Sequence, residues 1–170
     1  LLDRVGFTGW SADCTRRGAW FGSGSATMTN SVAQAADLVA SDFNAGSNRE
    51  KLELLLEYSE NLPPLPERYA EHPDLFERVE ECQSPVFLFV EVENDQVGVF
   101  FTAPEEAPTT RGFAGILSEV LNDKPVSQVL SLSDDFPDQI GLTEAVSPLR
   151  IRGMRAMIYR IKRQVREKVA

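Results

Sequence analysis

This chain of 170 residues contains few of the side chains that build metal sites and disulfide frameworks: it has two cysteines and one histidine. A zinc ribbon or zinc finger needs four cysteine or histidine ligands at characteristic spacing, so that class is excluded. Cys14 and Cys82 lie far apart in the chain and form no disulfide framework. We therefore expect a reducing, cytoplasmic compartment in which a thiol stays free, and we expect no metal and no cofactor.

Positive charge and long apolar runs are also scarce. The chain has 17 Lys and Arg against 26 Asp and Glu, a net charge of −9. Nucleic acid is thereby excluded as the main partner, because phosphate binding needs an excess of basic side chains on the contact face. No apolar run approaches the ~18 residues that a membrane-spanning helix needs, so no membrane association is expected.

The charge that is present is unevenly distributed. Residues 150–170 hold eight of the 17 basic residues and one acidic residue, whereas residues 1–149 hold nine basic and 25 acidic residues. Such a contrast indicates either that the basic tail lies against the acidic body or that it faces an acidic partner. A solvated basic face on a terminal helix is the simpler alternative.

The composition predicts one folded domain with an extension. Residues 1–27 contain five of the eleven glycines and show neither helical nor strand periodicity, so we expect a disordered extension or a non-native leader there. Met28 follows this segment directly. Residues 28–170 are expected to form a single domain, because apolar residues make up 42% of the chain and charged residues 25%, as in ordinary globular proteins.

Periodicity within this domain predicts an α+β fold, in which a small antiparallel sheet is flanked by helices. Residues 85–93 and 96–102 read as two strands that are joined by a turn at Asn94 and Asp95. Apolar spacing in the second helix marks Leu52, Leu55 and Leu56 as candidates for burial. Residues 74–80 are expected to add one helical turn. The expected helices are residues 31–43, 48–61, 111–121 and 148–168, and residues 125–132 and 136–140 are expected to form short helices or turns.

Cys82 is the candidate for chemistry. It lies in a polar junction immediately before the most apolar strand, where a thiol is both positioned and accessible. A partly buried, unreactive small residue is the alternative. Because a thiolate is the nucleophile and Glu80 and Glu81 disfavour it, a cation must come from elsewhere. The basic last helix, which starts near Arg150, is the expected source.

Four short stretches follow one another in the chain: LPPL from Leu62, CQSPVF from Cys82, RGF from Arg111 and SPLRIRGM from Ser147. In order and spacing they resemble the SufE family of sulfur-acceptor proteins in iron–sulfur cluster assembly. The family pattern has a leucine-proline-x-leucine segment, a glycine-cysteine-glutamine-serine loop, a lysine-glycine helix start, and a proline-x-arginine-x-x-glycine-leucine turn. This chain has Glu81 where the family usually has glycine.

The resemblance implies a fold similar to SufE and to the NifU/IscU scaffolds. It implies that a pyridoxal-phosphate cysteine desulfurase, SufS-like, passes persulfide sulfur to Cys82, and that the sulfur goes on to a SufBCD-like scaffold. The family's arginine corresponds to Arg150, and the family's aspartate corresponds to Glu106. Glu106 is expected either to pair with Arg150 or Arg111 or to lie in solvent. Such a carrier is a sulfur-transfer protein rather than a stand-alone enzyme, and we expect a monomer or a weak homodimer.

Other functions remain open at this stage. The chain could regulate a desulfurase by binding alone, or carry sulfur for another pathway such as tRNA thiolation. A cysteine hydrolase would need a base next to Cys82, and His72 is the single histidine. An iron–sulfur scaffold would need about three or four Cys or His ligands, which residues 28–170 do not supply.

Overall fold

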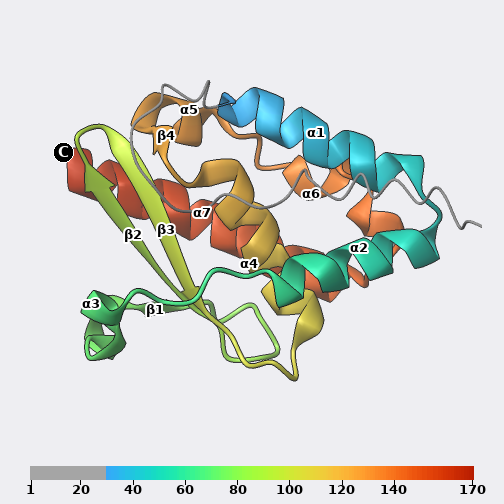
Figure 1. The fold of residues 1–170 in the computed structure, drawn as a ribbon, viewed down its shortest axis with the longest axis horizontal. Coiled ribbons are helices and arrows are strands. Elements are labelled where there is room, and N and C mark those ends of the chain that lie inside the picture. Colours follow the sequence, from blue (N-terminus) through green and yellow to red (C-terminus); the bar gives the residue numbers. More distant parts are fainter. Residues whose placement is uncertain (1–29) are drawn as a thin grey trace, which may run out of the picture.

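The computed structural model describes residues 30–170, so our expectations for residues 1–27 lie outside the described residues. The described part has α-helices around a four-stranded antiparallel sheet of order β1-β2-β3-β4, which confirms the α+β class (Figure 1). The elements, with 3₁₀ helices written η, are α1 (Val32–Ala45), α2 (Asn48–Glu60), α3 (Glu67–Ala70), η1 (Pro73–Leu75), β1 (Glu77–Arg78), β2 (Phe87–Glu93), β3 (Gln96–Thr102), α4 (Pro108–Leu121), β4 (Lys124–Pro125), α5 (Val126–Ser131), α6 (Phe136–Gln139), η2 (Leu142–Glu144) and α7 (Pro148–Val169).

The central hairpin is where the two runs rich in aromatic and β-branched residues, and the turn between them, predicted it. Strands β2 and β3 pair from Phe87 opposite Thr102 to Glu93 opposite Gln96. Asn94 and Asp95 form the turn and have positive φ angles of 51° and 64°. Two such residues in succession match the right-handed twist of the strands, and Asn and Asp tolerate this conformation better than most residues.

Local sequence signals also set the ends of several helices. Ser31 and Ser47 cap α1 and α2, and each forms a reciprocal capping box with the residue three positions on, Gln34 and Glu50. Helix α4 begins at Pro108, three residues earlier than the apolar spacing predicted. Proline suits this first turn because its missing N–H would have no partner inside the helix.

Two features of the fold differ from the sequence-based expectation. Residues 74–80 do not form one helical turn: η1 ends at Leu75, and β1 follows and pairs with the start of β2. A strand of two residues is too short to show a period and forms only because β2 supplies its partner. In α2, Leu55 is buried as expected, but Leu52 and Leu56 are 45% and 46% exposed.

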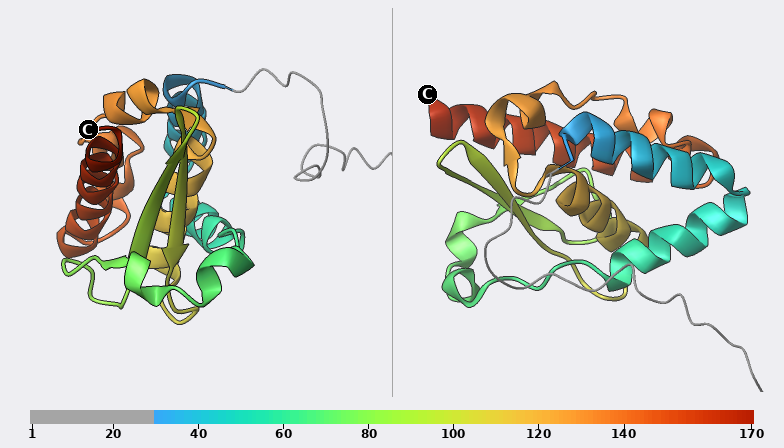
Figure 2. Two further views of the ribbon diagram at one scale, coloured as in Figure 1. Left: turned by 90° about the vertical axis from the view of Figure 1, so that its left-hand side faces the viewer. Right: turned by 45° about the horizontal axis from the view of Figure 1, so that its top comes forward.

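Helices α4 and α7 form the scaffold of the core. Helix α7 packs along β2, and α4 lies against β3 and α2 (Figures 1 and 2). The approach of α2 to α4 requires glycine at two positions. A Cβ on Gly112 would lie 2.5 Å from the carbonyl oxygen of Leu55, and one on Gly115 would lie 2.3 Å from that of Tyr58. The missing side chains of these two glycines let α4 pack directly against the backbone of α2.

The basic last helix lies against the acidic body, as the first of the three interpretations of the charge contrast expected. Side chains of α7 form ion pairs with acidic residues that precede it in the chain. These pairs are Arg155 with Asp138, Arg160 with Glu77 and Glu81, Lys162 with Asp134, and Arg163 with Glu77. Ion pairs therefore hold the segment that contains Glu77 and Glu81 against α7.

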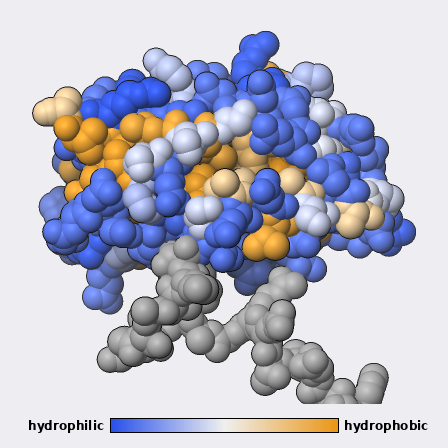
Figure 3. All heavy atoms as spheres, turned by 90° about the horizontal axis from the view of Figure 1, so that it is seen from above, coloured by the Kyte–Doolittle hydropathy of each residue, from blue (hydrophilic) through white to orange (hydrophobic). Residues whose placement is uncertain are grey.

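The face of the molecule shown in Figure 3 is mainly hydrophilic. On the face shown in Figure 3, a patch of apolar side chains lies among polar ones. Apolar side chains are common on folded surfaces, so this patch by itself identifies no partner. Within residues 30–170, no helix combines the length and the apolar character that crossing a bilayer requires.

Candidate functional site

Cys82 lies in the loop between β1 and β2, as the polar junction predicted. The loop is closed at its base, where the N–H of Val79 donates to the carbonyl of Val86 over 2.9 Å. Within the loop, the N–H of Cys82 donates to the carbonyl of Val79 over 3.1 Å. Both valines are fully buried. The loop of residues 80–85 is therefore anchored to the core at both ends, and this anchoring fixes the position of Cys82.

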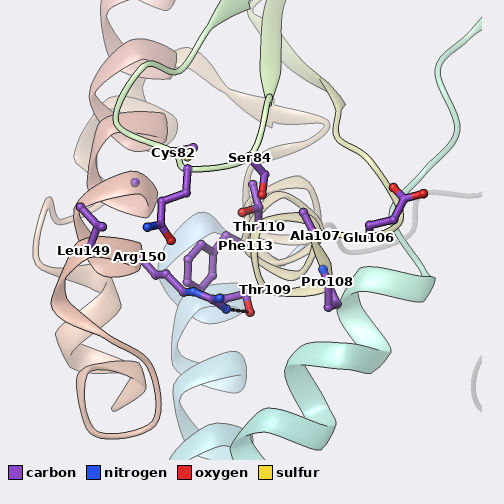
Figure 4. Close-up of a pocket in the computed structure, with 12 residues that line it drawn as sticks. Cys82, Ser84, Glu106, Ala107, Pro108, Thr109, Thr110, Phe113, Leu149 and Arg150 are labelled. Carbon is purple, nitrogen blue, oxygen red and sulfur yellow. Dashed lines mark hydrogen bonds between the residues drawn. The ribbon is translucent and has the colours of Figure 1, made fainter.

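Beside this loop is a pocket of about 160 Å³. It gathers the three residues that the sequence singled out, Cys82, Arg150 and Glu106, on different elements (Figure 4). The loop, the start of α4 and the start of α7 form its walls. The lining residues are Cys82, Gln83, Ser84, Glu106, Ala107, Pro108, Thr109, Thr110, Phe113, Leu149, Arg150 and Gly153.

The three predicted residues share the pocket but do not contact one another by any hydrogen bond or ion pair in the described structure. Arg150 donates to the hydroxyl of Thr109, and Glu106 lies at the other end of the pocket from Cys82 (Figure 4). Arg111 donates to the carbonyls of Ala103 and Ser59. The expected pairing of Glu106 with Arg150 or Arg111 is therefore not formed.

The thiol of Cys82 faces inward at rest. Its side chain is half-buried and packs against the hydrophobic core. It also lies against the backbone of α7, because a Cβ on Gly153 would come within 2.8 Å of the sulfur. Burial raises the pKa of the Cys82 thiol to about 11; Glu81 adds to this increase, and Arg160 opposes it. In this position the thiol is almost entirely protonated at neutral pH.

The cation that acts on this thiol comes from the last helix, as expected, but it is Arg160 and not Arg150. The guanidinium of Arg160 lies 3.1 Å from Glu77 and 2.8 Å from Glu81, and its side chain is only 13% exposed. Gly153 and Arg160 are seven residues apart, which places them on one face of α7 two turns apart. That face meets the Cys82 loop, whereas Arg150 turns toward α4.

Glu81, at the position where the family pattern has glycine, needs no left-handed backbone. Among the described residues, positive φ at a residue other than glycine occurs only at Asn94, Asp95 and Asp123. One carboxylate oxygen of Glu81, Oε2, is buried and accepts no directed hydrogen bond. Its charge is met by Arg160 alone among the interactions of the described chain. Glu81 thus anchors the loop to α7 next to the thiol.

Comparison with known proteins identifies the family. The model of the SufE domain, described as an Fe-S metabolism associated domain, matches residues 37–165. The chain belongs to the SufE family. Membership of this family supports a role in sulfur transfer for iron–sulfur metabolism. Members of the SufE family generally act together with cysteine desulfurases.

Individual relatives of this SufE-family chain agree with the family model. An uncharacterized SufE-like protein of Mycobacterium tuberculosis is 48% identical over 130 residues, which cover 76% of this chain and 90% of that one. A SufE-like protein of Arabidopsis thaliana, named as chloroplastic/mitochondrial, is 29% identical over 65% of this chain and 29% of its own length. The solution structure of a hypothetical protein from Thermus thermophilus superposes with a TM-score of 0.67 at 36% identity, covering 81% of this chain and 95% of that one.

In the described part of the chain, two alternative functions lack the residues that they need: a cysteine hydrolase and an iron–sulfur cluster scaffold. His72 is exposed, its Nδ1 lies 3.9 Å from a carboxylate oxygen of Asp74, and it does not line the Cys82 pocket, so it is not placed as a base for a cysteine hydrolase. Within residues 30–170, no three His, Cys, Asp or Glu side chains are grouped so that they could hold a metal ion. A cluster scaffold would need such a group.

Sequence reasoning gave no role to two residues beside Cys82, Arg160 and Gly153, although Gly153 belongs to the SPLRIRGM stretch that resembles the family. A glycine in the interior of a long basic helix is a signal in itself, because it weakens the helix unless something packs closely against it. The seven-residue spacing to Arg160 places both residues on one face. That this face meets Cys82, however, depends on how α7 packs along β2.

The raised pKa predicts a specific dependence of stability on pH. The folded state favours the neutral thiol, so this contribution to the free energy of unfolding is complete below the ordinary thiol pKa of 9.0 and is lost as the pH rises through about 11. Between pH 9 and 11 the melting temperature of the wild type should therefore fall more steeply than that of Cys82→Ser, whose hydroxyl does not titrate. Thermal denaturation at a series of pH values measures this, and parallel curves would contradict a buried resting thiol.

Proposed function

We propose that this SufE-family protein accepts sulfur from a cysteine desulfurase as a persulfide on Cys82 and delivers it to an iron–sulfur cluster scaffold of the SufBCD type. The observation that supports this most is the position of Cys82. It is the single cysteine of residues 30–170 and lies on a loop rooted in the core, beside a pocket lined by Arg150. A nucleophile on an anchored loop at the edge of a pocket is what such a transfer requires.

The chemistry is thiol exchange. The thiolate of Cys82 attacks the outer sulfur of the donor's persulfide, the S–S bond of the donor breaks, and the donor cysteine leaves as a thiolate. A new S–S bond forms on Cys82, so one sulfur atom changes place and neither an oxidant nor a reductant is consumed. Because Cys82 is the single cysteine of residues 30–170, no other cysteine of this part of the chain can attack the new persulfide and release its sulfur as sulfide.

The resting thiol is not ready for this step. Its pKa of about 11 leaves very little thiolate at neutral pH, and burial is the main cause. Sulfur acceptance therefore requires Cys82 to leave its position against α7 and enter the pocket or the solvent, where the cost of ionisation falls. In this proposal, Cys82 makes this movement when the desulfurase docks beside the loop.

Arg150 and Glu106 have separate roles in the proposal. Arg150 lines the pocket next to Thr109, and its fixed positive charge favours the anionic persulfide once the sulfur points into the pocket. Glu106 is exposed at the opposite end, where it can contact the desulfurase but not the sulfur. Arg150 is thus proposed to act on the product of the transfer and Glu106 on docking.

Mass spectrometry tests the proposal directly. After incubation with a cysteine desulfurase and free cysteine, the wild-type protein should gain one sulfur atom, ~32 Da, on the peptide that contains Cys82, and a reducing thiol should remove it. The matched control is Cys82→Ser, which should show no gain. Faster desulfurase turnover without any mass gain on the wild type would overturn the carrier function and establish binding-only regulation instead.

A further inference from the structure

Gly153 is the single glycine of α7 and lies inside that helix, in a buried position. Glycine is a poor choice there, since it weakens a helix relative to alanine. Its surroundings explain its presence. The three atoms nearest to a Cβ built on Gly153 all belong to the Cys82 loop: the sulfur at 2.8 Å, the Cα of Cys82 at 3.7 Å and the carbonyl oxygen of Glu81 at 3.8 Å.

We propose that Gly153 is a positioning residue for Cys82: its missing side chain forms the space in which the resting thiol is held away from solvent and from persulfide donors. Gly153 does not touch the reacting partner and takes no part in the transfer. It determines how accessible the sulfur is before the partner docks. The link from accessibility to sulfur acceptance rests on the proposed function, whereas the positioning itself does not.

The helix cannot easily yield to an added methyl group. Ile151, Met154 and Met157 are at most 2% exposed and fix this part of α7 in the core on both sides of Gly153. A sulfur atom 2.8 Å from a carbon is well inside ordinary contact distance. The Cys82 loop can move more easily than α7, because Cys82 is held by one backbone hydrogen bond and the adjacent ion pair of Glu81 with Arg160. An alanine at this position therefore pushes the thiol toward the pocket.

The first measurement is the rate of alkylation of Cys82 by iodoacetamide near pH 7.5. Gly153→Ala should react about tenfold faster than the wild type or more, because a displaced thiol loses the burial that suppresses its ionisation. Arg152→Ala, at an exposed neighbouring position of the same helix, is the matched control and should react like the wild type. An unchanged rate in a folded Gly153→Ala protein would overturn the proposal.

The second measurement is a double-mutant cycle on the melting temperature. In the Cys82→Ala background the sulfur is absent, so Gly153→Ala should raise the melting temperature by about 2–4 °C through helix propensity alone. In the wild-type background this gain should vanish or reverse, because the methyl group meets the sulfur. Equal shifts in the two backgrounds would contradict the proposal.

The double-mutant cycle also decides the proposal if Gly153→Ala alone folds poorly. If Gly153→Ala fails to fold alone but folds with Cys82→Ala, the sulfur is the obstacle and the proposal is supported. If it folds in neither background, Gly153 serves another contact and the proposal is overturned. Faster alkylation of Gly153→Ala with no ~32 Da gain on any variant would keep the positioning role and reject the sulfur-carrier function.

Discussion

Replacing Cys82 with serine is expected to abolish both the sulfur gain and the stimulation of desulfurase turnover, while the fold is retained. Serine is nearly isosteric with cysteine, but its hydroxyl stays protonated at neutral pH and does not attack a persulfide. The half-buried position tolerates a slightly smaller side chain, so we expect a loss of about 1 kcal/mol of stability or less. Desulfurase turnover and circular dichroism on the same samples provide the two readouts.

The outcome of this substitution separates two functions. A folded Cys82→Ser protein that still stimulates the desulfurase fully would show that binding alone regulates the partner, and it would remove Cys82 from the mechanism. A folded protein that binds the desulfurase as the wild type does, without stimulating it, would agree with a carrier. Binding therefore has to be measured separately, for example by calorimetry with the purified desulfurase.

Replacing Arg160 with glutamine is expected to have the largest effect on stability and on the thiol together. Glutamine keeps much of the packing but removes the charge that faces Glu77 and Glu81. The pair is half-buried, between the exposed pairs that contribute little and the buried pairs whose disruption is costly, so we expect a loss of about 2 kcal/mol. For a chain of this size, the melting temperature should fall by about 4–8 °C.

The same substitution should raise the pKa of Cys82 further. Arg160 is the cation that lowers this pKa, and without it Glu81 acts on the thiol unopposed. Alkylation of Cys82 should therefore be slower at a fixed pH. Arg150→Gln is the matched control and should leave the profile nearly unchanged, because Arg150 donates to Thr109. A shifted profile in Arg150→Gln together with an unchanged one in Arg160→Gln would reverse this assignment.

The parts of the fold that followed from sequence are those in which neighbouring residues carry the information. The β2–β3 hairpin was predictable because its strands are rich in aromatic and β-branched residues, its turn residues tolerate positive φ, and the two strands are adjacent in the chain. Strands β1 and β4 were not predictable, since two residues have no measurable period. Leu52 and Leu56 have helical spacing but remain exposed, because only tertiary packing decides which face of α2 meets α4.

At the candidate site, too, local sequence signals predicted some features and tertiary packing decided the others. The sequence alone determined the α+β class and the family and pointed to Cys82 as the candidate nucleophile, because short motifs in a fixed order and a polar junction before an apolar strand are local properties of the chain. It also indicated that a cation from the basic last helix would oppose the acidic neighbours of Cys82. Only the tertiary structure decided that this cation is Arg160, that Glu106 lies apart from the sulfur, and that Gly153 makes room for the thiol. These facts depend on how α7 packs along β2, and packing joins residues that are far apart in the chain.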